Sequence, residues 1–189
     1  MSGKRRAHTL AVEKAVIMLG ELYAPEKIGV LRAAALLHDI TKELTVEEHV
    51  KILREHGIET TKADIMADKT LHAKTAALLI PEKYPEFATT EVVDAVRWHT
   101  TGHAGMTLTE KLVYLADYID ETRKFPDCVR LREMFWSKDP QSMDKAEKDA
   151  HLRCVLMTSF KMTVSALVDE ERPISTDTID ALNELIIEK

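Results

Sequence analysis

The sequence is poor in the residues that mark β turns or cross-link small folds. It holds 6 glycines, 6 prolines and 2 cysteines among 189 residues, and no stretch alternates apolar with polar side chains. Without such alternation there is no signal for half-buried strands. Cys128 and Cys154 are isolated from each other, which argues against a disulfide and against thiolate metal ligands.

The chain also lacks a long apolar run and an excess of positive charge. No stretch approaches the roughly 20 apolar residues that a membrane-spanning helix needs. The basic residues 4–6 are not followed by a signal-peptide core, because Glu13 and Lys14 interrupt the apolar run. We therefore expect a cytoplasmic protein without a membrane partner. The formal net charge of −6 argues against a nucleic-acid partner, although a few Lys or Arg residues and metal ions can still bind a nucleotide's phosphates.

What is present is helical periodicity along nearly the whole chain, which predicts an all-α fold. A length of 189 residues suits one domain with a substantial core. The predicted helices cover residues 5–22, 25–40, a segment capped by Thr45 and stopped by Gly57, a segment from Thr70 that ends before Pro81, 91–99 capped by Thr90, a segment from Thr107 or Thr109 to about Thr122, a segment from Pro126, residues 140–171, and a last segment capped by Thr176.

Asp139-Pro140 is the one plausible internal boundary. Residues 1–139 contain nearly all of the candidate chemistry, so we interpret them as the functional core. We interpret residues 140–189 as a C-terminal helical extension that packs onto the same domain.

Six residues at or beside apolar helical segments carry that chemistry. His38 and Asp39 directly follow an apolar run, residues 33–37, so we expect both side chains to be buried. His8 lies 30 residues before His38, and His72, His99 and Asp117 lie 34, 61 and 79 residues after it. Buried His and Asp side chains without partners would cost several kcal/mol, and a bound cation removes that penalty.

These six donors exceed what one ion holds while keeping an open position, so the sequence favours two ions that share a carboxylate. Such a pair is suited to displacement at phosphorus. By ligand type, iron, manganese, cobalt and nickel fit about equally. Each residue alone also fits a helix cap or a satisfied core group, and only their joint placement favours a metal centre.

The other histidines give weaker signals. His49 and His56 fall in a charged helical segment and are expected to be solvated, and His151 lies in the polar start of the long helix. His103 follows His99 across the break at Thr100, Thr101 and Gly102. We favour a pocket-wall or ligand-supporting role for His103 over direct ligation.

The ordered set of donors resembles that of the HD-domain superfamily of metal-dependent phosphohydrolases. It is most similar to the YqeK-type family of symmetrical diadenosine-tetraphosphate (Ap4A) hydrolases. The resemblance covers roughly residues 5–170 and rests on Arg5-Arg6-Ala7-His8, Leu36-Leu37-His38-Asp39-Ile40-Thr41-Lys42, His72, Trp98-His99-Thr100-Thr101-Gly102 and Tyr114-Leu115-Ala116-Asp117-Tyr118-Ile119-Asp120-Glu121-Thr122-Arg123. The family usually has Glu-Pro where this chain has Asp120-Glu121.

The resemblance implies an HD-domain helical bundle with a di-iron centre. It implies that His8, His38 and Asp117 hold one metal, that His72 and His99 hold the other, and that Asp39 bridges them. The implied reaction is cleavage of Ap4A into two ADP by a metal-activated water.

Several residues are candidates for catalysis or for substrate binding. Asp39 and Lys42 are the catalytic candidates, with Lys42 also placed to contact phosphate. Arg123 can grip a distal phosphate with two hydrogen bonds. Candidates for lining the phosphate path are Thr100, Thr101, Gly102 and His103. The alternatives are a solvated Lys42, an ion pair of Arg123 with Asp120 or Glu121, and a loop that merely ends a helix.

Three rival functions remain open from sequence. One is another HD-type phosphohydrolase that acts on a nucleoside mono- or triphosphate. Another is a non-catalytic nucleotide sensor, which the retention of all six donors disfavours. The third is a helical scaffold with polar core histidines. The oligomeric state also stays open, with a homodimer as one alternative.

Overall fold

The computed structural model describes residues 1–188, and these contain helices and no strand. The longer helices are α1 (Gly3–Tyr23), α2 (Ile28–Leu37), α3 (Val46–Glu55), α5 (Leu71–Lys83), α6 (Thr90–Trp98), α7 (Leu108–Ile119), α8 (Pro126–Trp136), α9 (Lys145–Asp169) and α10 (Thr176–Ile187). Shorter elements are α4 (Lys62–Met66) and the 3₁₀ turns η1 (Pro25–Lys27), η2 (Asp68–Thr70) and η3 (Pro85–Phe87). The predicted all-α class is confirmed.

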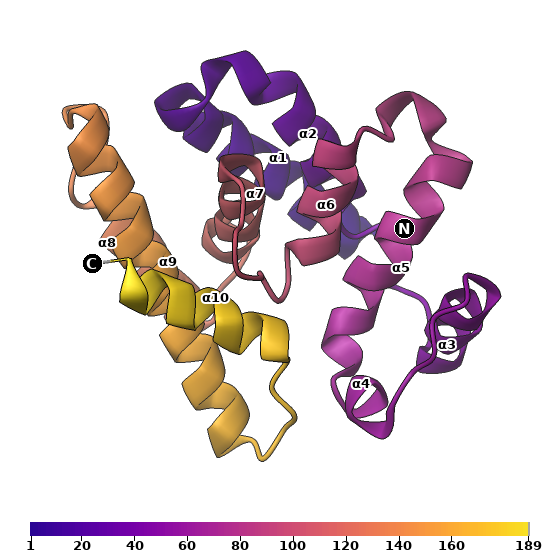
Figure 1. Cartoon of the computed structure of the whole chain (residues 1–189). Helices are drawn as coiled ribbons and strands as arrows, with labels where there is room; N and C mark the ends of the chain where they lie inside the picture. Colours follow the sequence, from indigo (N-terminus) through magenta and orange to yellow (C-terminus); the bar gives the residue numbers. More distant parts are fainter. Residues whose placement is uncertain (189) are drawn as a thin grey trace.

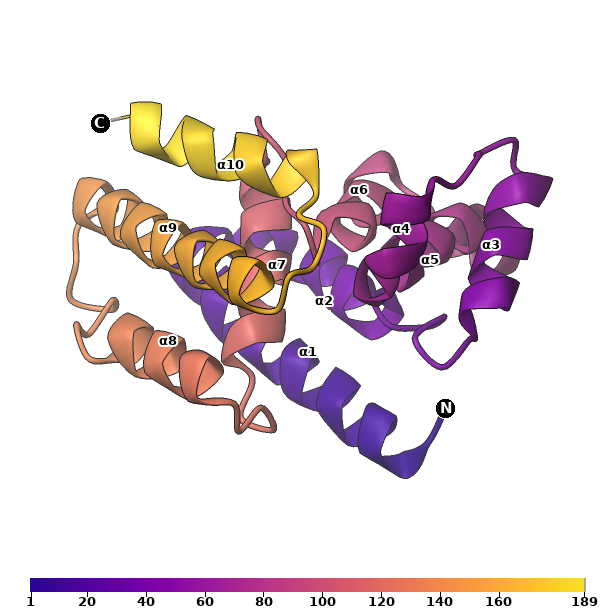
Figure 2. The ribbon, with the colours of Figure 1, turned by 90° about the horizontal axis from the view of Figure 1, so that it is seen from below.

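Helix α7 occupies the middle of the bundle. It packs against α1, α2 and α6 on one side and against α8 on another. Figure 1 shows α8, α9 and α10 grouped beside this helix, and the turned view in Figure 2 shows the same grouping. Its core-facing residues Leu112, Val113, Tyr114, Leu115 and Ala116 are all fully buried. The element that carries Asp117 is therefore held on several sides.

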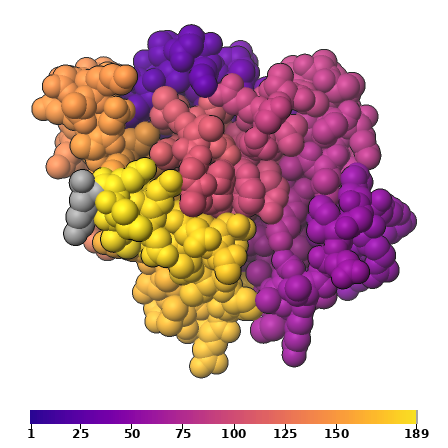
Figure 3. Space-filling model, in the orientation of Figure 1, coloured from indigo at the N-terminus to yellow at the C-terminus, as the bar shows by residue number. Residues whose placement is uncertain are grey.

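The predicted extension shares the hydrophobic core with the rest of the chain. Phe160 of α9 stacks on Tyr114 of α7 with ring centroids 4.7 Å apart, and Tyr114 Oη lies 3.1 Å from Ser159 Oγ. Arg172, in the loop between α9 and α10, donates to the carboxylate of Asp68 and to the main-chain oxygen of Met66. Figure 3 shows the gold and yellow C-terminal segment meeting the violet residues of this region. The boundary at Asp139 itself stays a prediction.

Several predicted helix ends are wrong for local reasons. The second helix ends at Leu37 instead of Ile40, since His38 Nδ1 bonds the main-chain oxygen of Ala35 and successive turns follow. Helix α5 runs through Pro81 to Lys83, because a proline in the last turn removes only one hydrogen bond and Tyr84 N closes the helix on Ile80 O at 2.8 Å.

The starts of three helices also differ from the prediction. Thr89 and not Thr90 caps α6, and Ser175 and not Thr176 precedes α10. The long helix begins at Lys145, where Asp144 and Glu147 form a capping box. Helix α4 was not predicted, although Thr61 and Asp64 form the same motif there.

None of the helices that the structure describes has the length and hydropathy for a bilayer crossing.

Candidate functional site

The six predicted metal donors lie together at the inner ends of five helices. His8 projects from α1, His38 and Asp39 from the turns after α2, His72 from α5, His99 from the end of α6 and Asp117 from α7. All six side chains are buried. We call this set the donor cluster.

Asp39 stands between two pairs of imidazoles. Its Oδ2 lies 3.5 Å from His8 Nε2 and 3.4 Å from His38 Nε2. Its Oδ1 lies 3.2 Å from His72 Nε2 and 4.0 Å from His99 Nε2. Each carboxylate oxygen thus faces a different pair, which is the arrangement that a bridging ligand between two ions requires.

The remaining distances complete two adjoining groups. Asp117 Oδ1 lies 3.0 Å from His8 Nε2 and 3.9 Å from His38 Nε2, and one donor atom of each fits within 4.8 Å of the others. His72 Nε2 lies 3.0 Å from His99 Nε2 on the other side of Asp39. His38, Asp39 and His99 also satisfy the 4.8 Å criterion, so the two groups touch through the shared carboxylate.

Backbone contacts fix how two of the imidazoles present their nitrogens. His38 Nδ1 lies 2.7 Å from Ala35 O, and His99 Nδ1 lies 2.7 Å from Val96 O. A donated Nδ1–H leaves the Nε2 lone pair directed into the cluster. The buried Nε2 atoms of His8 and His38 make no hydrogen bond. Because unsatisfied buried polar atoms are costly, these orphan nitrogens fit metal ligation.

The electrostatics of the cluster favour positive charge at its centre. Burial alone would lower the pKa of His8, but interactions with Asp117 and Asp120 outweigh it and raise that pKa to about 9. Burial would raise the pKa of Asp39, yet contacts with His38 and His72 hold it well below its usual range. Burial lowers the pKa of His72 to about 4, which keeps this imidazole neutral and able to ligate.

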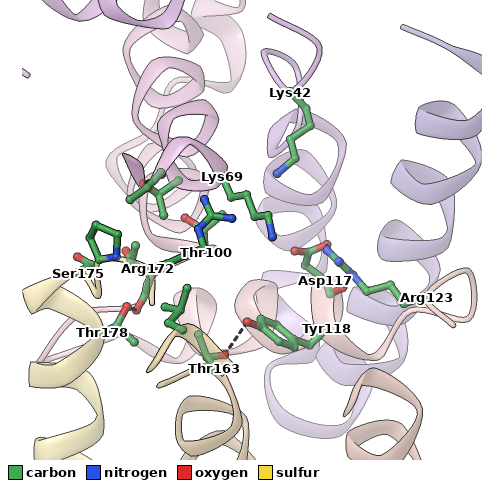
Figure 4. Close-up of a pocket in the computed structure, with 15 residues that line it drawn as sticks. Lys42, Lys69, Thr100, Asp117, Tyr118, Arg123, Thr163, Arg172, Ser175 and Thr178 are labelled. Atoms are coloured by element: carbon green, nitrogen blue, oxygen red, sulfur yellow. Dashed lines mark hydrogen bonds and ion pairs between the residues drawn. The ribbon is translucent and has the colours of Figure 1, made fainter. Parts of the chain in front are cut away.

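A cavity of about 240 Å³, the central pocket, opens onto the donor cluster. Its polar lining combines residues from both ends of the chain: Lys42, Lys69, Thr70, Thr100, Thr101, Asp117, Tyr118, Arg123, Thr163, Arg172, Ser175 and Thr178. Figure 4 shows Lys42, Lys69 and Arg123 directing their nitrogens toward the space beside Asp117. The segment interpreted as a packing extension therefore supplies one wall of the pocket.

The predicted substrate residues divide into two sets. Lys42, Thr100, Thr101 and Arg123 line the central pocket, whereas Gly102 and His103 do not. Gly102 has φ +60°, and a Cβ there would lie 2.5 Å from Phe160 Cζ, so packing and backbone conformation account for the glycine. The His103 ring packs against Trp98 with ring centroids 4.6 Å apart and the planes tilted by 42°, and its Nε2 lies 2.9 Å from a carboxylate oxygen of Glu110.

The two predicted cations are held close to the donor cluster. Lys42 Nζ lies 3.1 Å from Nδ1 of His72, and burial lowers the lysine pKa, so it is not a solvated helix-end residue. Arg123 pairs with the carboxylate of Asp117, and its Nε lies 3.4 Å from Asp120 Oδ2. The ion pair with Asp120 that was one alternative for Arg123 is thus present, and it coexists with a place in the pocket lining.

Comparison with known proteins gives a family for this arrangement. The family model described as "HD domain" matches residues 5–122, a range that contains all six donors.

The chain belongs to the HD-domain family.

Relatives of this HD-domain chain extend over nearly its full length. It is 30% identical over 187 residues to a protein of Halalkalibacterium halodurans named "Bis(5'-nucleosyl)-tetraphosphatase, symmetrical", covering 98% of this chain and 90% of that protein. Proteins with the same name from Staphylococcus aureus and Bacillus subtilis are each 30% identical over 182 residues. For S. aureus the match covers 95% of this chain and 86% of that protein, and for B. subtilis 96% and 89%.

Among solved structures, one neighbour is a predicted HD superfamily hydrolase involved in NAD metabolism from Clostridium acetobutylicum. It matches with a TM-score of 0.84 and 30% identity, over 100% of this chain and 92% of that chain.

Two residues beside the donor cluster were not predicted as part of the site. Asp120 is 1% exposed, and its Oδ2 lies 3.4 Å from His8 Nδ1, on the side of the ring that faces away from the cluster. Arg5 pairs with Oδ2 of Asp39. The signal for Asp120 was its spacing of three residues from Asp117, which brings the carboxylate of the residue that follows α7 to the same side of the helix end.

The prediction that His49 is solvated is wrong. His49 is 4% exposed, and its Nδ1 lies 2.8 Å from Thr75 Oγ1. Thr75 donates to Thr41 Oγ1 at 3.0 Å, and Thr41 donates to the main-chain oxygen of His72 at 2.8 Å. This buried chain of hydrogen bonds ties the turn after α2 to α5, and it therefore links the two segments that carry Asp39 and His72.

His151 is also buried, and its Nε2 bonds Phe135 O at 2.9 Å. His56 is exposed as predicted, and its Nε2 lies 2.9 Å from a carboxylate oxygen of Glu82.

Proposed function

We propose that this protein hydrolyses diadenosine tetraphosphate symmetrically into two ADP. The observation that carries the proposal is Asp39 set between two pairs of imidazoles, beside a pocket with four cationic side chains. The full-length relatives named symmetrical bis(5'-nucleosyl)-tetraphosphatases support the choice of substrate. The protein is a metal-dependent phosphohydrolase with a nucleotide as its small-molecule partner.

The residues present fit two divalent cations. His8, His38 and Asp117 would hold one and His72 and His99 the other, with Asp39 shared between them. Bound there, such ions would supply Lewis acidity at phosphorus and a nucleophile at neutral pH. We propose iron as the metal on the strength of the family resemblance, with manganese, cobalt and nickel as alternatives of equal ligand preference.

The cations of the central pocket neutralise the phosphate chain. Lys42 and Arg123 lie against ligands of the two metal groups, so they are placed to contact the phosphates that react. Lys69 and Arg172 line the same pocket and extend its positive charge. Charge-assisted hydrogen bonds of this kind are strongest where water is excluded, and Arg123 is largely buried.

Two threonines complete the polar lining. The Oγ1 atoms of Thr100 and Thr101 are buried without a hydrogen-bond partner, and both residues line the central pocket. Each hydroxyl can donate to a phosphoryl oxygen, which would satisfy its own unmet hydrogen bond.

Product analysis tests the proposal. Purified protein loaded with iron or manganese is incubated with Ap4A, and the products are separated by anion-exchange chromatography. ADP as the sole nucleotide product is the expected result. ATP with AMP, or free phosphate, would assign another HD-type reaction, such as one on nucleoside mono- or triphosphates. Binding of Ap4A without turnover by the loaded protein would assign a sensor.

Variants of two donor-cluster residues test whether the measured hydrolysis comes from this protein's metal site or from a contaminating enzyme. Asp39→Asn and His38→Ala are expected to lose both turnover and bound metal while far-ultraviolet circular dichroism stays helical. Turnover retained by either variant would contradict the assignment. NAD serves as a comparison substrate because of the description of the C. acetobutylicum neighbour, and it is expected to be cleaved poorly.

A further inference from the structure

A second cavity adjoins the central pocket in the groove between α8 and α9. Its volume is about 350 Å³. Lys69, Tyr118, Thr163 and Leu167 line both cavities, so the two are direct neighbours, and the hydrogen bond of 2.8 Å between Tyr118 Oη and Thr163 Oγ1 lies at their border. We call it the α8–α9 groove, and its own lining includes Phe125, Leu131, Met162 and Ala166. We propose that it binds the second nucleoside of the substrate, an inference that rests on the proposed function.

The symmetry of the reaction calls for such a site. Cleavage of a dinucleoside polyphosphate into equal halves means that two nucleosides extend in opposite directions from the reacting phosphorus. The central pocket, at about 240 Å³, lies below the range of about 300–1,000 Å³ in which pockets enclose drug-sized ligands. It therefore encloses at most part of the substrate, and the neighbouring cavity offers room for the rest.

The central pocket is lined mainly by positive charge, whereas the α8–α9 groove is lined mainly by carboxylates and apolar side chains. This difference fits a division of the substrate into phosphates and nucleoside. The central pocket carries Lys42, Lys69, Arg123 and Arg172, which suit phosphates. The α8–α9 groove shares Lys69 with it, and its other charged residues are Asp127 and Glu170. Carboxylates repel phosphate, but they accept hydrogen bonds from ribose hydroxyls and from the amino group of a base. The groove thus suits the uncharged end of the substrate.

The apolar lining of the groove suits a base. Phe125 is 68% exposed although it is a large aromatic side chain, and the ring of the following Pro126 favours the extended backbone of Phe125, with φ −62° and ψ 138°. Across the groove, Met162, Ala166 and Leu167 of α9 offer an apolar wall. A base that enters between them can stack on the ring and cover it from water.

The test compares two substrates that share a tetraphosphate chain. Ap4A has two nucleosides, whereas adenosine 5'-tetraphosphate has one. The kcat/KM for Ap4A divided by the kcat/KM for adenosine 5'-tetraphosphate measures the contribution of the second nucleoside. Phe125→Ala is expected to lower this ratio about tenfold, which is the scale of one base stacked on one aromatic ring. Phe125→Trp should retain the ratio. Phe87→Ala, which removes a 45% exposed ring outside both cavities, is the matched control and should leave the ratio unchanged.

Two results would overturn the inference. One is an unchanged ratio in Phe125→Ala, and the other is an equal loss with both substrates, which would make the groove the site of the first nucleoside. Both results presuppose a wild-type protein that cleaves Ap4A into two ADP. Failure of the wild type to do so would count against the proposed function instead.

Discussion

Replacing Asp120 by asparagine tests whether this residue orients a metal ligand. The carboxylate is buried, and its Oδ2 lies 3.4 Å from His8 Nδ1. Its Oδ1 accepts a hydrogen bond from Thr122 N at 2.8 Å, which the side-chain oxygen of asparagine can still do. The substitution therefore replaces the carboxylate oxygen that faces His8 by an amide nitrogen and removes the negative charge behind the ring, while Thr122 Oγ1 stays 3.4 Å from the same Nδ1.

The expected effect is confined to one metal. Loss of a carboxylate behind a ligating imidazole typically weakens metal affinity 10- to 100-fold, or about 1.4–2.7 kcal/mol. We therefore expect Asp120→Asn to lose the ion near His8 in a chelator competition titration, while the ion near His72 and His99 stays bound at wild-type affinity.

The control for Asp120→Asn is Asp144→Asn, which changes a helix-capping carboxylate far along the chain from the site. It should leave the titration unchanged, because the asparagine oxygen can still cap the helix. Wild-type affinity for both ions in Asp120→Asn would refute the orienting role. Equal weakening of both ions would also refute it, because that pattern would point to a general loosening of the cluster.

Two further predictions concern the buried contacts of His49. Thr75→Val removes a hydroxyl from a fully buried side chain and leaves His49 Nδ1 without a partner, so it should lower the free energy of unfolding by about 2–4 kcal/mol, measured by urea denaturation. Thr75→Ser keeps the hydroxyl and should lower it by only about 1 kcal/mol. Equal losses in the two variants would contradict the hydrogen-bond network. Burial lowers the pKa of His49, so below about pH 6.5 the unfolded chain binds a proton that the folded protein does not. The free energy of unfolding therefore decreases as the pH is lowered. His49→Asn should make that fall shallower between about pH 7 and about pH 5, and an unchanged slope would show that His49 does not contribute to it.

The fold class and the burial of the six proposed donors could be predicted from sequence because both depend on short-range patterns. Helical periodicity identifies the core-facing side of each helix, and a His or Asp next to that side is expected to be buried. His38 illustrates this, since it follows an apolar run and is fully buried. Helix ends were less predictable, because neighbouring threonines such as Thr89 and Thr90 have the same capping chemistry and only backbone geometry decides between them.

Sequence says less about residues whose environment is set by distant segments. His49 lies in a helix with charged neighbours, and only its contact with Thr75 of α5 makes it a buried residue. Gly102 looked like part of a phosphate loop, whereas the ring of Phe160, far along the chain, accounts for it. Neither contact has a local signature in the sequence.

The C-terminal helices support the site in a way that their own sequence does not predict. They contain none of the six donors, yet Phe160 and Ser159 of α9 hold Tyr114 of α7 three residues before Asp117. The loop that follows α9 places Arg172 in the wall of the central pocket. The matched HD region, residues 5–122, thus contains the six proposed metal donors, while the residues that follow it support the helix that carries one of them and line the central pocket. Differences in substrate choice among proteins with this donor set are therefore expected to arise in the walls built by α8, α9 and the α9–α10 loop, because the donor cluster itself leaves little freedom to vary.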